Sequence, residues 1–215
     1  PLGSDSHSGQ TSYDNLYSDT KLWVEKNWID YVAPQLYWNN KNTFQNYNKM
    51  IDWWTKTCTG NLHLYIGLAL YKLDENYVPY TLIDQVKIAR SKNNIQGTLF
   101  YRAQTFSKNS KNFKEAFAQT IYNYNSLVPT MPWLDSIPPA KPENLSVENL
   151  PSFVHLKWKE PKAESILDKV RYYVVYRFDG VVKNPDLSVK NILKITNGIQ
   201  FTDTQVSKGK KYTYI

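Results

Sequence analysis

The chain has 215 residues, of which 41% are hydrophobic and 21% charged, a composition typical of a globular chain with one large domain or two small ones. No apolar run reaches the ~18 residues that a membrane span needs, so we predict no transmembrane segment. The one cysteine and three histidines show no disulfide or metal-ligand pattern, so we predict no metal or cofactor. The net charge is +7, and residues 138–215 carry +5 of it. Because these charges form no basic stripe or recognition motif, the sequence disfavours a nucleic acid as partner. An anionic surface such as a cell wall is the alternative partner.

The chain begins with a segment that we exclude from the fold. Residues 1–4, Pro1-Leu2-Gly3-Ser4, are typical of the scar of an engineered protease site, so the natural start is hidden. The first predicted element is a helix over Tyr13–Lys26, with Leu16, Leu22 and Trp23 on one side.

Three repeats of one pattern follow, each a short apolar run and then an amphipathic helix. The predicted strands are Trp28–Trp38, Leu62–Tyr71 and Gln96–Arg102, and the helices follow them at about 44–57, 80–92 and 111–124. Apolar strands alternating with helices indicate consecutive βα units and a parallel sheet. The fold class predicted for this part is therefore α/β.

A proline-rich joint divides the chain. Five prolines between Leu127 and Pro142 favour an extended connector, so we place a domain boundary there and assign residues 5–137 and 138–215 to separate domains. After the joint the periodicity becomes two. Phe153–Trp158 alternates, with Val154, Leu156 and Trp158 on one face, and Val170–Phe178 alternates similarly. This pattern predicts a β-sandwich with a buried Trp158.

The segment from Tyr13 to Asp135 resembles the C-terminal part of the glycosyl hydrolase-like 10 family, bacterial barrel proteins related to glycoside hydrolases. Five motifs carry the resemblance: Ser12-Tyr13-Asp14-Asn15-Leu16-Tyr17-Ser18-Asp19-Thr20, Trp28-Ile29-Asp30-Tyr31-Val32-Ala33-Pro34-Gln35-Leu36-Tyr37-Trp38, Trp53-Trp54, Leu64-Tyr65-Ile66-Gly67-Leu68-Ala69-Leu70-Tyr71-Lys72 and Gly97-Thr98-Leu99-Phe100-Tyr101. The remainder resembles a fibronectin type III module, with its proline-rich entry, the Trp158 strand and Tyr173-Val174-Val175-Tyr176-Arg177.

These resemblances imply the last three βα units of a (β/α)₈ TIM-type barrel followed by a small all-β fibronectin type III-like sandwich. A full barrel takes ~250 residues, so the upstream part, with the acidic residues expected to carry catalysis, is expected to be missing. The sandwich is also expected to lack its last strand. We therefore expect the chain to be a fragment of a bacterial protein of the cell envelope or extracellular space.

In a barrel of this type the active site lies at the carboxyl ends of the strands. There each predicted strand places a tyrosine next to a Trp, Lys or Arg, and tyrosine rings stack on sugars while cations pair with sugar carboxylates. The candidate substrate-binding residues are Gln35, Tyr37, Trp38, Tyr71, Lys72, Tyr101 and Arg102. The alternative is that these tyrosines pack beneath loops and the cations are solvated.

Glycoside cleavage normally needs two carboxylates that flank the scissile bond, and the sequence shows no convincing pair. Asp30 lies at the N-terminal side of its strand, which is the stability end of a barrel. Asp74 and Glu75 lie in a loop on the correct face, where adjacent acids are usually just solvated. Asp135 fits a cap in the connector, and Cys58 has no evident base partner. The catalytic residues are left unassigned.

Three functions remain open. In the first, the parent protein is a glycoside hydrolase that acts on an acidic or cell-wall, peptidoglycan-like polysaccharide. In the second, it is a glycan-binding protein without activity. In the third, it is an interaction module whose active part is the basic sandwich. We favour the first, and expect no turnover from this chain alone. Because three strands of an open barrel leave two edges and an inner face uncovered, we also expect self-association or pairing with the missing N-terminal portion.

Overall fold

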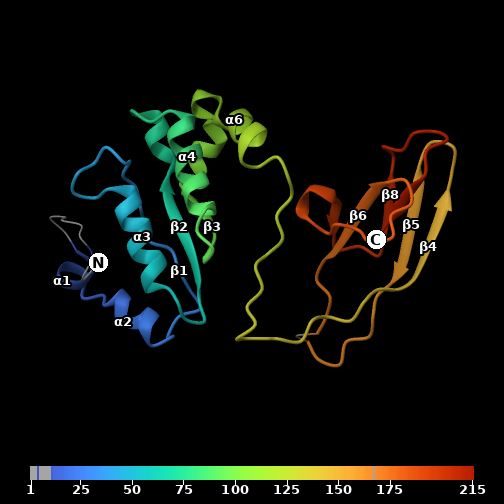
Figure 1. Cartoon of the computed structure of the whole chain (residues 1–215), viewed down its shortest axis with the longest axis horizontal. Coiled ribbons are helices and arrows are strands. Elements are labelled where there is room, and N and C mark those ends of the chain that lie inside the picture. Colours follow the sequence, from blue (N-terminus) through green and yellow to red (C-terminus); the bar gives the residue numbers. More distant parts are fainter. Residues whose placement is uncertain (1–3, 5–10, 167) are drawn as a thin grey trace. The chain divides into compact units, whose positions relative to one another are not determined.

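The computed structural model describes residue 4, residues 11–166 and residues 168–215, and divides the chain into two compact units, Pro1–Asn123 and Tyr124–Ile215 (Figure 1). Both helices and strands are present, as the sequence predicts. The first three residues of the predicted protease-site scar, and His7, lie outside the described residues. The described connector between Thr120 and Glu143 holds neither helix nor strand, and the domain boundary at residue 137 stays a prediction.

Unit 1, Pro1–Asn123, is built on a parallel three-stranded sheet. The strands β1 (Tyr31–Val32), β2 (His63–Ala69) and β3 (Ile95–Tyr101) pair in the order β1-β2-β3. Helix α3 (Tyr47–Thr57) packs against β2, and α4 (Pro79–Arg90) against β3 and α6 (Phe113–Thr120). The predicted succession of parallel βα units is confirmed.

The two faces of this sheet differ. Leu64, Ile66 and Leu68 are completely buried in the core formed with α3, α4 and α6. Successive side chains of a strand point to opposite faces, so Tyr65, Gly67 and Ala69 lie on the face away from these helices. Tyr31, Leu99 and Tyr101 share that face, because they pair beside His63, Gly67 and Ala69 of β2, which all point to it. The exposed fractions of Tyr31, Leu99 and Tyr101 are 57%, 48% and 53%. One face of the sheet is therefore packed, and the other is open at its two outer strands, whereas His63, Gly67 and Ala69 of β2 are buried.

The segment after β1, Pro34–Leu36, lies in close backbone contact with Gly67 of β2. The Leu36 amide donates to the Gly67 carbonyl at 2.9 Å, and the Gly67 amide donates to the Pro34 carbonyl at 2.9 Å. A Cβ atom on Gly67 would lie 2.9 Å from the Pro34 oxygen and 3.3 Å from the Gln35 Cα. Only glycine allows this approach without a shift of the backbone.

Several predicted bounds were wrong. The first predicted helix is two short helices, α1 (Ser12–Leu16) and α2 (Thr20–Glu25), because Tyr17 takes a left-handed conformation and Asp19 caps the second helix. The first strand pairs only at Tyr31–Val32 and, through an isolated bridge, at Gln35. Pro34 between them has no amide hydrogen to donate.

The later βα units also differ in detail from the prediction. The second strand ends at Ala69, and a 3₁₀ helix, η1 (Leu70–Asp74), follows it. The third unit contains a helix that the sequence analysis missed, α5 (Ala103–Lys108). A short η2 (Ser110–Asn112) then precedes α6, because Asn109, Lys111 and Asn112 have positive φ angles and delay the last helix.

Unit 2, Tyr124–Ile215, consists of two three-stranded antiparallel sheets and a short η3 (Val189–Asn191). One sheet is β4 (Glu143–Asn149), β5 (Val154–Lys159) and β8 (Gln200–Asp203). The other is β7 (Ile192–Thr196), β6 (Tyr173–Asp179) and β9 (Tyr212–Tyr214). The predicted alternation of β5 is confirmed, and Trp158 is buried against Tyr173 of the other sheet, with ring centroids 5.3 Å apart.

Candidate functional site

Three tyrosines meet at the carboxyl ends of the parallel strands. The ring centroids of Tyr37 and Tyr71 are 6.1 Å apart, those of Tyr71 and Tyr101 are 6.1 Å apart, and those of Tyr37 and Tyr101 are 6.3 Å apart. We call these residues the tyrosine cluster. Tyr37 and Tyr71 are half-buried and Tyr101 is exposed, so the cluster presents aromatic surface to solvent. Burial, with the neighbouring phenols of Tyr71 and Tyr101, raises the pKa of Tyr37, which keeps this hydroxyl protonated and able to donate.

The backbone beneath the cluster is held by two side chains of the next βα unit. Lys72 Nζ donates to the Tyr37 carbonyl at 2.7 Å, and Tyr77 Oη donates to the same carbonyl at 3.1 Å. The Lys72 ammonium also lies 5.3 Å from the centroid of the Tyr77 ring. Lys72 therefore holds the backbone of Tyr37, and its contact with a ligand stays a prediction.

A buried glutamine holds the next residue of the site. Gln85 on α4 donates from Nε2 to the Trp38 carbonyl at 2.8 Å, and the buried Tyr47 hydroxyl donates to the Gln85 carbonyl at 2.8 Å. Sequence reasoning missed Tyr77 and Gln85. For Gln85 a signal existed, since a polar residue on the apolar face of a helix needs a hydrogen-bond partner. Trp38 is half-buried, and Gln35 is exposed beside Gly67.

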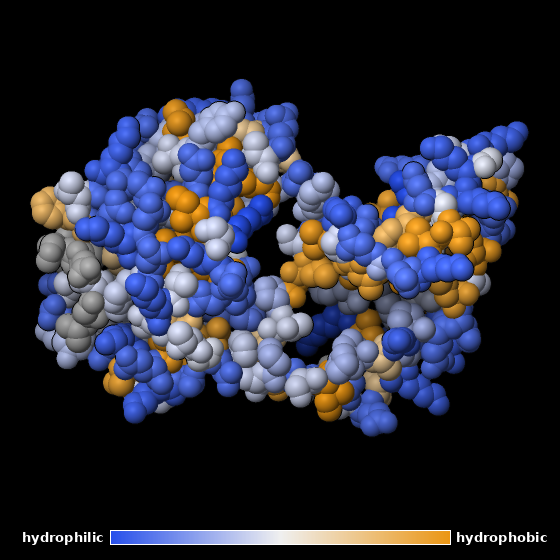
Figure 2. Space-filling view, viewed as in Figure 1, coloured by the Kyte–Doolittle hydropathy of each residue, from blue (hydrophilic) through white to orange (hydrophobic). Residues whose placement is uncertain are grey.

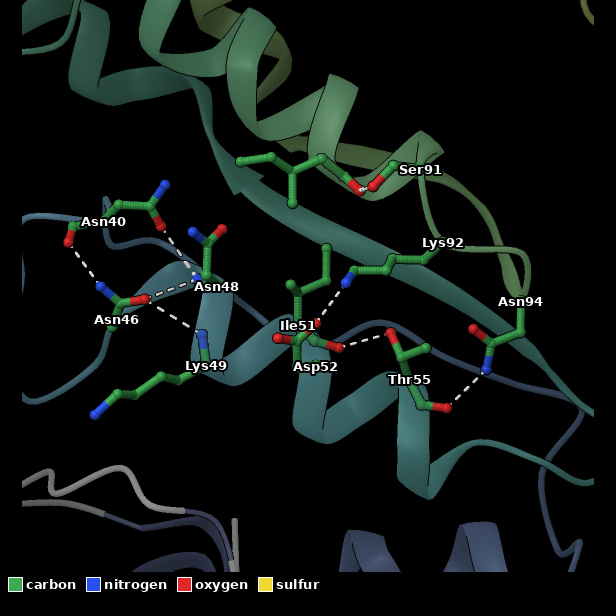
Figure 3. A network of polar contacts seen from close by, with 11 residues as sticks. Asn40, Asn46, Asn48, Lys49, Ile51, Asp52, Thr55, Ser91, Lys92 and Asn94 are labelled. Carbon is green, nitrogen blue, oxygen red and sulfur yellow. Dashed lines mark hydrogen bonds and ion pairs between the residues drawn. The ribbon is translucent and has the colours of Figure 1, made fainter.

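An asparagine-rich loop leads from Trp38 to α3 (Figure 3). Asn46 accepts hydrogen bonds from the amides of Asn48 and Lys49 and so caps the helix. Its Nδ2 donates to the Asn40 carbonyl at 2.6 Å, and Asn40 Oδ1 accepts from the Asn48 amide at 3.1 Å. These contacts tie the loop to the first turn of α3.

The far end of α3 is also anchored. Asn94 Nδ2 donates to the carbonyls of Thr55 and Cys58, each at 2.8 Å, and Lys92 pairs with Asp52 at 2.6 Å (Figure 3). Cys58 is 4% exposed, and burial raises the pKa of its thiol to about 12. A thiol of this kind stays protonated at neutral pH and is a poor nucleophile, which supports a structural role for Cys58.

Charged groups line the site beyond the tyrosines. Asp74 accepts a hydrogen bond from the Ser110 hydroxyl and pairs with Lys108 at 3.5 Å, joining the loops that follow β2 and β3. The Ser110 hydrogen bond, assisted by Lys108 and Arg102, lowers the pKa of Asp74. Arg102 is exposed, its carbonyl accepts from the Thr105 amide at 3.0 Å, and its guanidinium has no hydrogen bond or ion pair with the described residues, although its charge acts on the Asp74 carboxyl group. It is the candidate cation that remains available to a ligand.

The other candidate acids are Asp30, Asp135 and Glu75. A general acid in glycoside hydrolysis needs a raised pKa, and the lowered pKa of Asp74 suits a fixed anion instead. The Asp30 carbonyl accepts from the His63 amide at 2.9 Å, at the amino end of the sheet. Asp135 Oδ1 accepts from the Ile137 amide at 2.9 Å, in keeping with the predicted cap in the connector. Glu75 is exposed.

The described part of the chain contains neither a candidate membrane-spanning helix nor a candidate metal site. Its helices are all too short or too polar to cross a membrane. Within the same residues, His, Cys, Asp and Glu side chains form no group of three or more that could hold a metal ion.

The chain is similar to known glycosyl hydrolases. Residues 4–81 match the model of the family Glycosyl hydrolase-like 10, a match that spans β1, β2 and α3 and includes Tyr37 and Tyr71 but not Tyr101. Glycosyl hydrolase YngK of Bacillus subtilis (strain 168) is 31% identical over 220 residues, which cover 100% of this chain and 43% of the relative. Glycosyl hydrolase DigH of Escherichia coli (strain K12) is 42% identical over 76 residues, which cover 35% of this chain and 17% of the relative.

The chain thus spans less than half the length of these two curated relatives. The matches to the family model and to proteins named glycosyl hydrolases support a role related to glycoside hydrolysis. They also agree with the resemblance found in the first part of the sequence.

Proposed function

We propose that this chain is the C-terminal portion of a glycoside hydrolase that acts on a polysaccharide, an acidic or cell-wall glycan, in the cell envelope or extracellular space of a bacterium. Its three parallel strands would be the last βα units of a (β/α)₈ barrel, and unit 2 would be a fibronectin type III-like module. The observation that carries the proposal is the tyrosine cluster, which brings Tyr37, Tyr71 and Tyr101 together from three successive βα units. The catalytic acids would lie outside this chain.

The chemistry of the site fits a sugar ligand. Tyrosine rings offer flat apolar faces for the C–H groups of a sugar ring, and their hydroxyls offer hydrogen bonds to sugar hydroxyls. The exposed Gln35 and half-buried Trp38 extend this surface on the β1 side. Arg102 supplies a bidentate donor for a carboxylate on the sugar. Lys72 contributes indirectly, because it orients the backbone of Tyr37.

A matched pair of tyrosines tests the proposal. In the full-length parent, Tyr71→Ala should weaken binding of soluble cell-wall oligosaccharides by about 1–3 kcal/mol, the scale of one aromatic contact, and Trp38→Ala should do the same. Tyr31→Ala is the control, because Tyr31 pairs beside His63 at the opposite end of the sheet. Calorimetric affinities that change equally in Tyr31→Ala and Tyr71→Ala would contradict a sugar site at the carboxyl end.

A non-enzymatic glycan-binding protein is the second candidate. It is supported by the tyrosine cluster, whose sugar-binding chemistry does not depend on a catalytic carboxylate. Release of reducing ends from the same oligosaccharides by the full-length parent separates the two candidates. Binding without release would support the second, whereas release that depends on an upstream carboxylate supports the first.

A further inference from the structure

The loop that follows β3 is tied to the loop that follows β2 at two points. At the first, Lys108 pairs with the Asp74 carboxylate, and the Ser110 hydroxyl donates to the same carboxylate. At the second, Lys111 Nζ donates to the Tyr77 carbonyl at 2.5 Å. Three of the four side chains from Lys108 to Lys111 therefore contact a single neighbouring loop.

Tyr77 extends the second of these attachments to the tyrosine cluster. Its hydroxyl donates to the Tyr37 carbonyl at 3.1 Å, and Lys72 donates to the same oxygen at 2.7 Å. Tyr77 is 5% exposed, and burial raises the pKa of its phenol, which keeps the hydroxyl protonated as a donor. The contacts therefore run in series from Lys111 through Tyr77 to the peptide group that joins Tyr37 to Trp38.

The backbone around Lys111 is held in an unusual conformation. Lys111 has a φ angle of 57°, and Asn109 and Asn112 have φ angles of 50° and 54°. Asparagine tolerates this left-handed region, whereas a lysine adopts it at a cost. Such a conformation persists only where surrounding contacts outweigh that cost. Asn109 Oδ1 supplies one contact, because it accepts from the Lys114 amide at 3.0 Å, and the bond from Lys111 to Tyr77 supplies another.

The side chain of Lys111 is not simply solvated. Lys111 is exposed, and the surface of unit 1, on the left in Figure 2, is mostly hydrophilic. An exposed lysine on such a surface normally stays mobile, because holding its long side chain in one geometry costs rotamer entropy. Here the ammonium donates to the Tyr77 carbonyl and, at 3.5 Å, reaches the Glu75 carbonyl. Both acceptors belong to the loop after β2.

We propose that Lys111 is a positioning residue for the sugar site: through Tyr77 it sets the conformation of the Tyr37–Trp38 peptide and so holds the Tyr37 ring in the tyrosine cluster. The inference rests on the proposed function, because it takes Tyr37 and Trp38 as sugar-binding residues. It gives the loop after β3 a role in recognition at the end of β1, which lies two strands away in the sheet. Lys111 also lies outside residues 4–81, the part of the chain that matches the family model.

Nitrogen-15 labelling of tryptophan tests the proposal, because the amide nitrogen of the Tyr37–Trp38 peptide belongs to Trp38. The chain has seven tryptophans, so the spectrum is simple, and Trp38→Phe identifies the Trp38 signal. In Tyr77→Phe, which removes only the donating hydroxyl, the Trp38 amide should shift more than any other tryptophan amide of the 215-residue chain. Lys111→Met should shift it as well, although the substituted group bonds Tyr77 and not this peptide.

Two further variants and one internal reference control the measurement. Lys111→Arg should return the Trp38 amide to its original position, because a guanidinium also donates to a carbonyl. Lys114→Met removes the same charge from an exposed residue of α6 and should leave the amide in place. The Trp158 amide in unit 2 should not move in any variant. A Trp38 amide that stays in place in Tyr77→Phe and Lys111→Met, or that moves as far in Lys114→Met, would overturn the proposal.

Oligosaccharide affinity in the full-length parent separates failure of this inference from failure of the proposed function. Tyr77→Phe and Lys111→Met should each weaken binding about twofold to tenfold, the scale of one hydrogen bond, and Lys111→Arg should not. Unchanged affinity in both variants, with weakened binding in Tyr71→Ala, would overturn the positioning role and leave the sugar site intact. Unchanged affinity in Tyr71→Ala as well would defeat the proposed function, and the inference with it.

Discussion

At the scale of single residues, the candidate site depends on contacts between positions far apart in the sequence. The sequence placed Tyr37, Tyr71 and Tyr101 at strand ends; the structure brings the three rings together, with Tyr37 and Tyr71 beyond the ends of β1 and β2, and their binding of a substrate stays a prediction. The role of Lys72 was not predictable, because its partner is a backbone carbonyl 35 residues away. A side-chain bond to a distant carbonyl leaves no local pattern in either segment.

The different environments of Lys72 and Arg102 give a prediction. Arg102→Met should weaken binding of a carboxylate-bearing oligosaccharide without lowering the stability of unit 1, and the loss should shrink at high salt, as expected for an exposed ion pair. Lys72→Met should instead lower the thermal midpoint, because the Tyr37 carbonyl loses a half-buried donor. Calorimetry on the full-length parent measures the binding of each variant, and thermal unfolding measures its stability. A loss of binding in Lys72→Met with the same salt dependence as in Arg102→Met would show that Lys72 also contacts the ligand.

A second residue-scale prediction concerns Asp203, which is 1% exposed. Burial opposes its charge, but Arg177 at 2.9 Å, the Gln205 amide and the Tyr214 hydroxyl outweigh it and lower the pKa of Asp203. A carboxyl group whose pKa is lower in the folded state stabilises the fold above its unfolded pKa of about 3.9. That contribution is lost as the pH falls through the folded pKa.

Unit 2 should therefore lose stability in acid, below about pH 4. Hydrogen exchange of residues 200–215 as a function of pH, after correction for the intrinsic exchange rate, measures the loss. Asp203→Asn should remove this pH dependence and destabilise the unit at neutral pH. A pH dependence that survives unchanged in Asp203→Asn would assign it to another group.

At the scale of elements, periodicity predicted which elements exist better than where they end. Helices α3 and α4 were predicted closely, because their apolar residues recur at helical spacing over eleven and twelve residues. Helix α5 was missed because its six residues are too few to show a period. Strand β1 was predicted too long, since an apolar run does not reveal where Pro34 interrupts the pairing.

Gly67 gives a prediction at this scale. Gly67→Ala should destabilise unit 1 by about 1–3 kcal/mol, the usual cost of overpacking, because the new Cβ would press on the backbone of Pro34 and Gln35. It should also weaken ligand binding by shifting Tyr37. Gly198→Ala is the control, with its nearest contact at 3.6 Å. Thermal midpoints that fall by the same amount in both variants would count against the close approach as the cause.

At the scale of the whole molecule, the open face of the sheet in unit 1 predicts association. Tyr31, Leu99 and Tyr101 are about half exposed on that face, and β1 and β3 are edge strands. Large apolar surfaces of this kind normally mark contacts with other chains. The 215-residue chain should therefore scatter light at micromolar concentration with a mass above the 25.1 kDa of one copy.

Substitutions on and off the sheet check the cause of association. Leu99→Lys should shift the chain towards monomer, because a charge would then lie on the open face. Val78→Lys, at a residue 50% exposed just before α4, should leave the mass unchanged. A sharp monomer peak for the unsubstituted chain would rule out association through this face.

The buried thiol at the end of α3 gives the molecule an internal reporter. Cys58 is the only cysteine of the chain and lies in the core of unit 1. A thiol-alkylating reagent can reach it only when that unit opens, so the labelling rate measures the opening of unit 1 without a signal from unit 2. Ligand binding to unit 1 should lower the labelling rate of Cys58, so labelling with and without oligosaccharide would detect it. This readout separates unit 1 from unit 2, because unit 2 contains no cysteine.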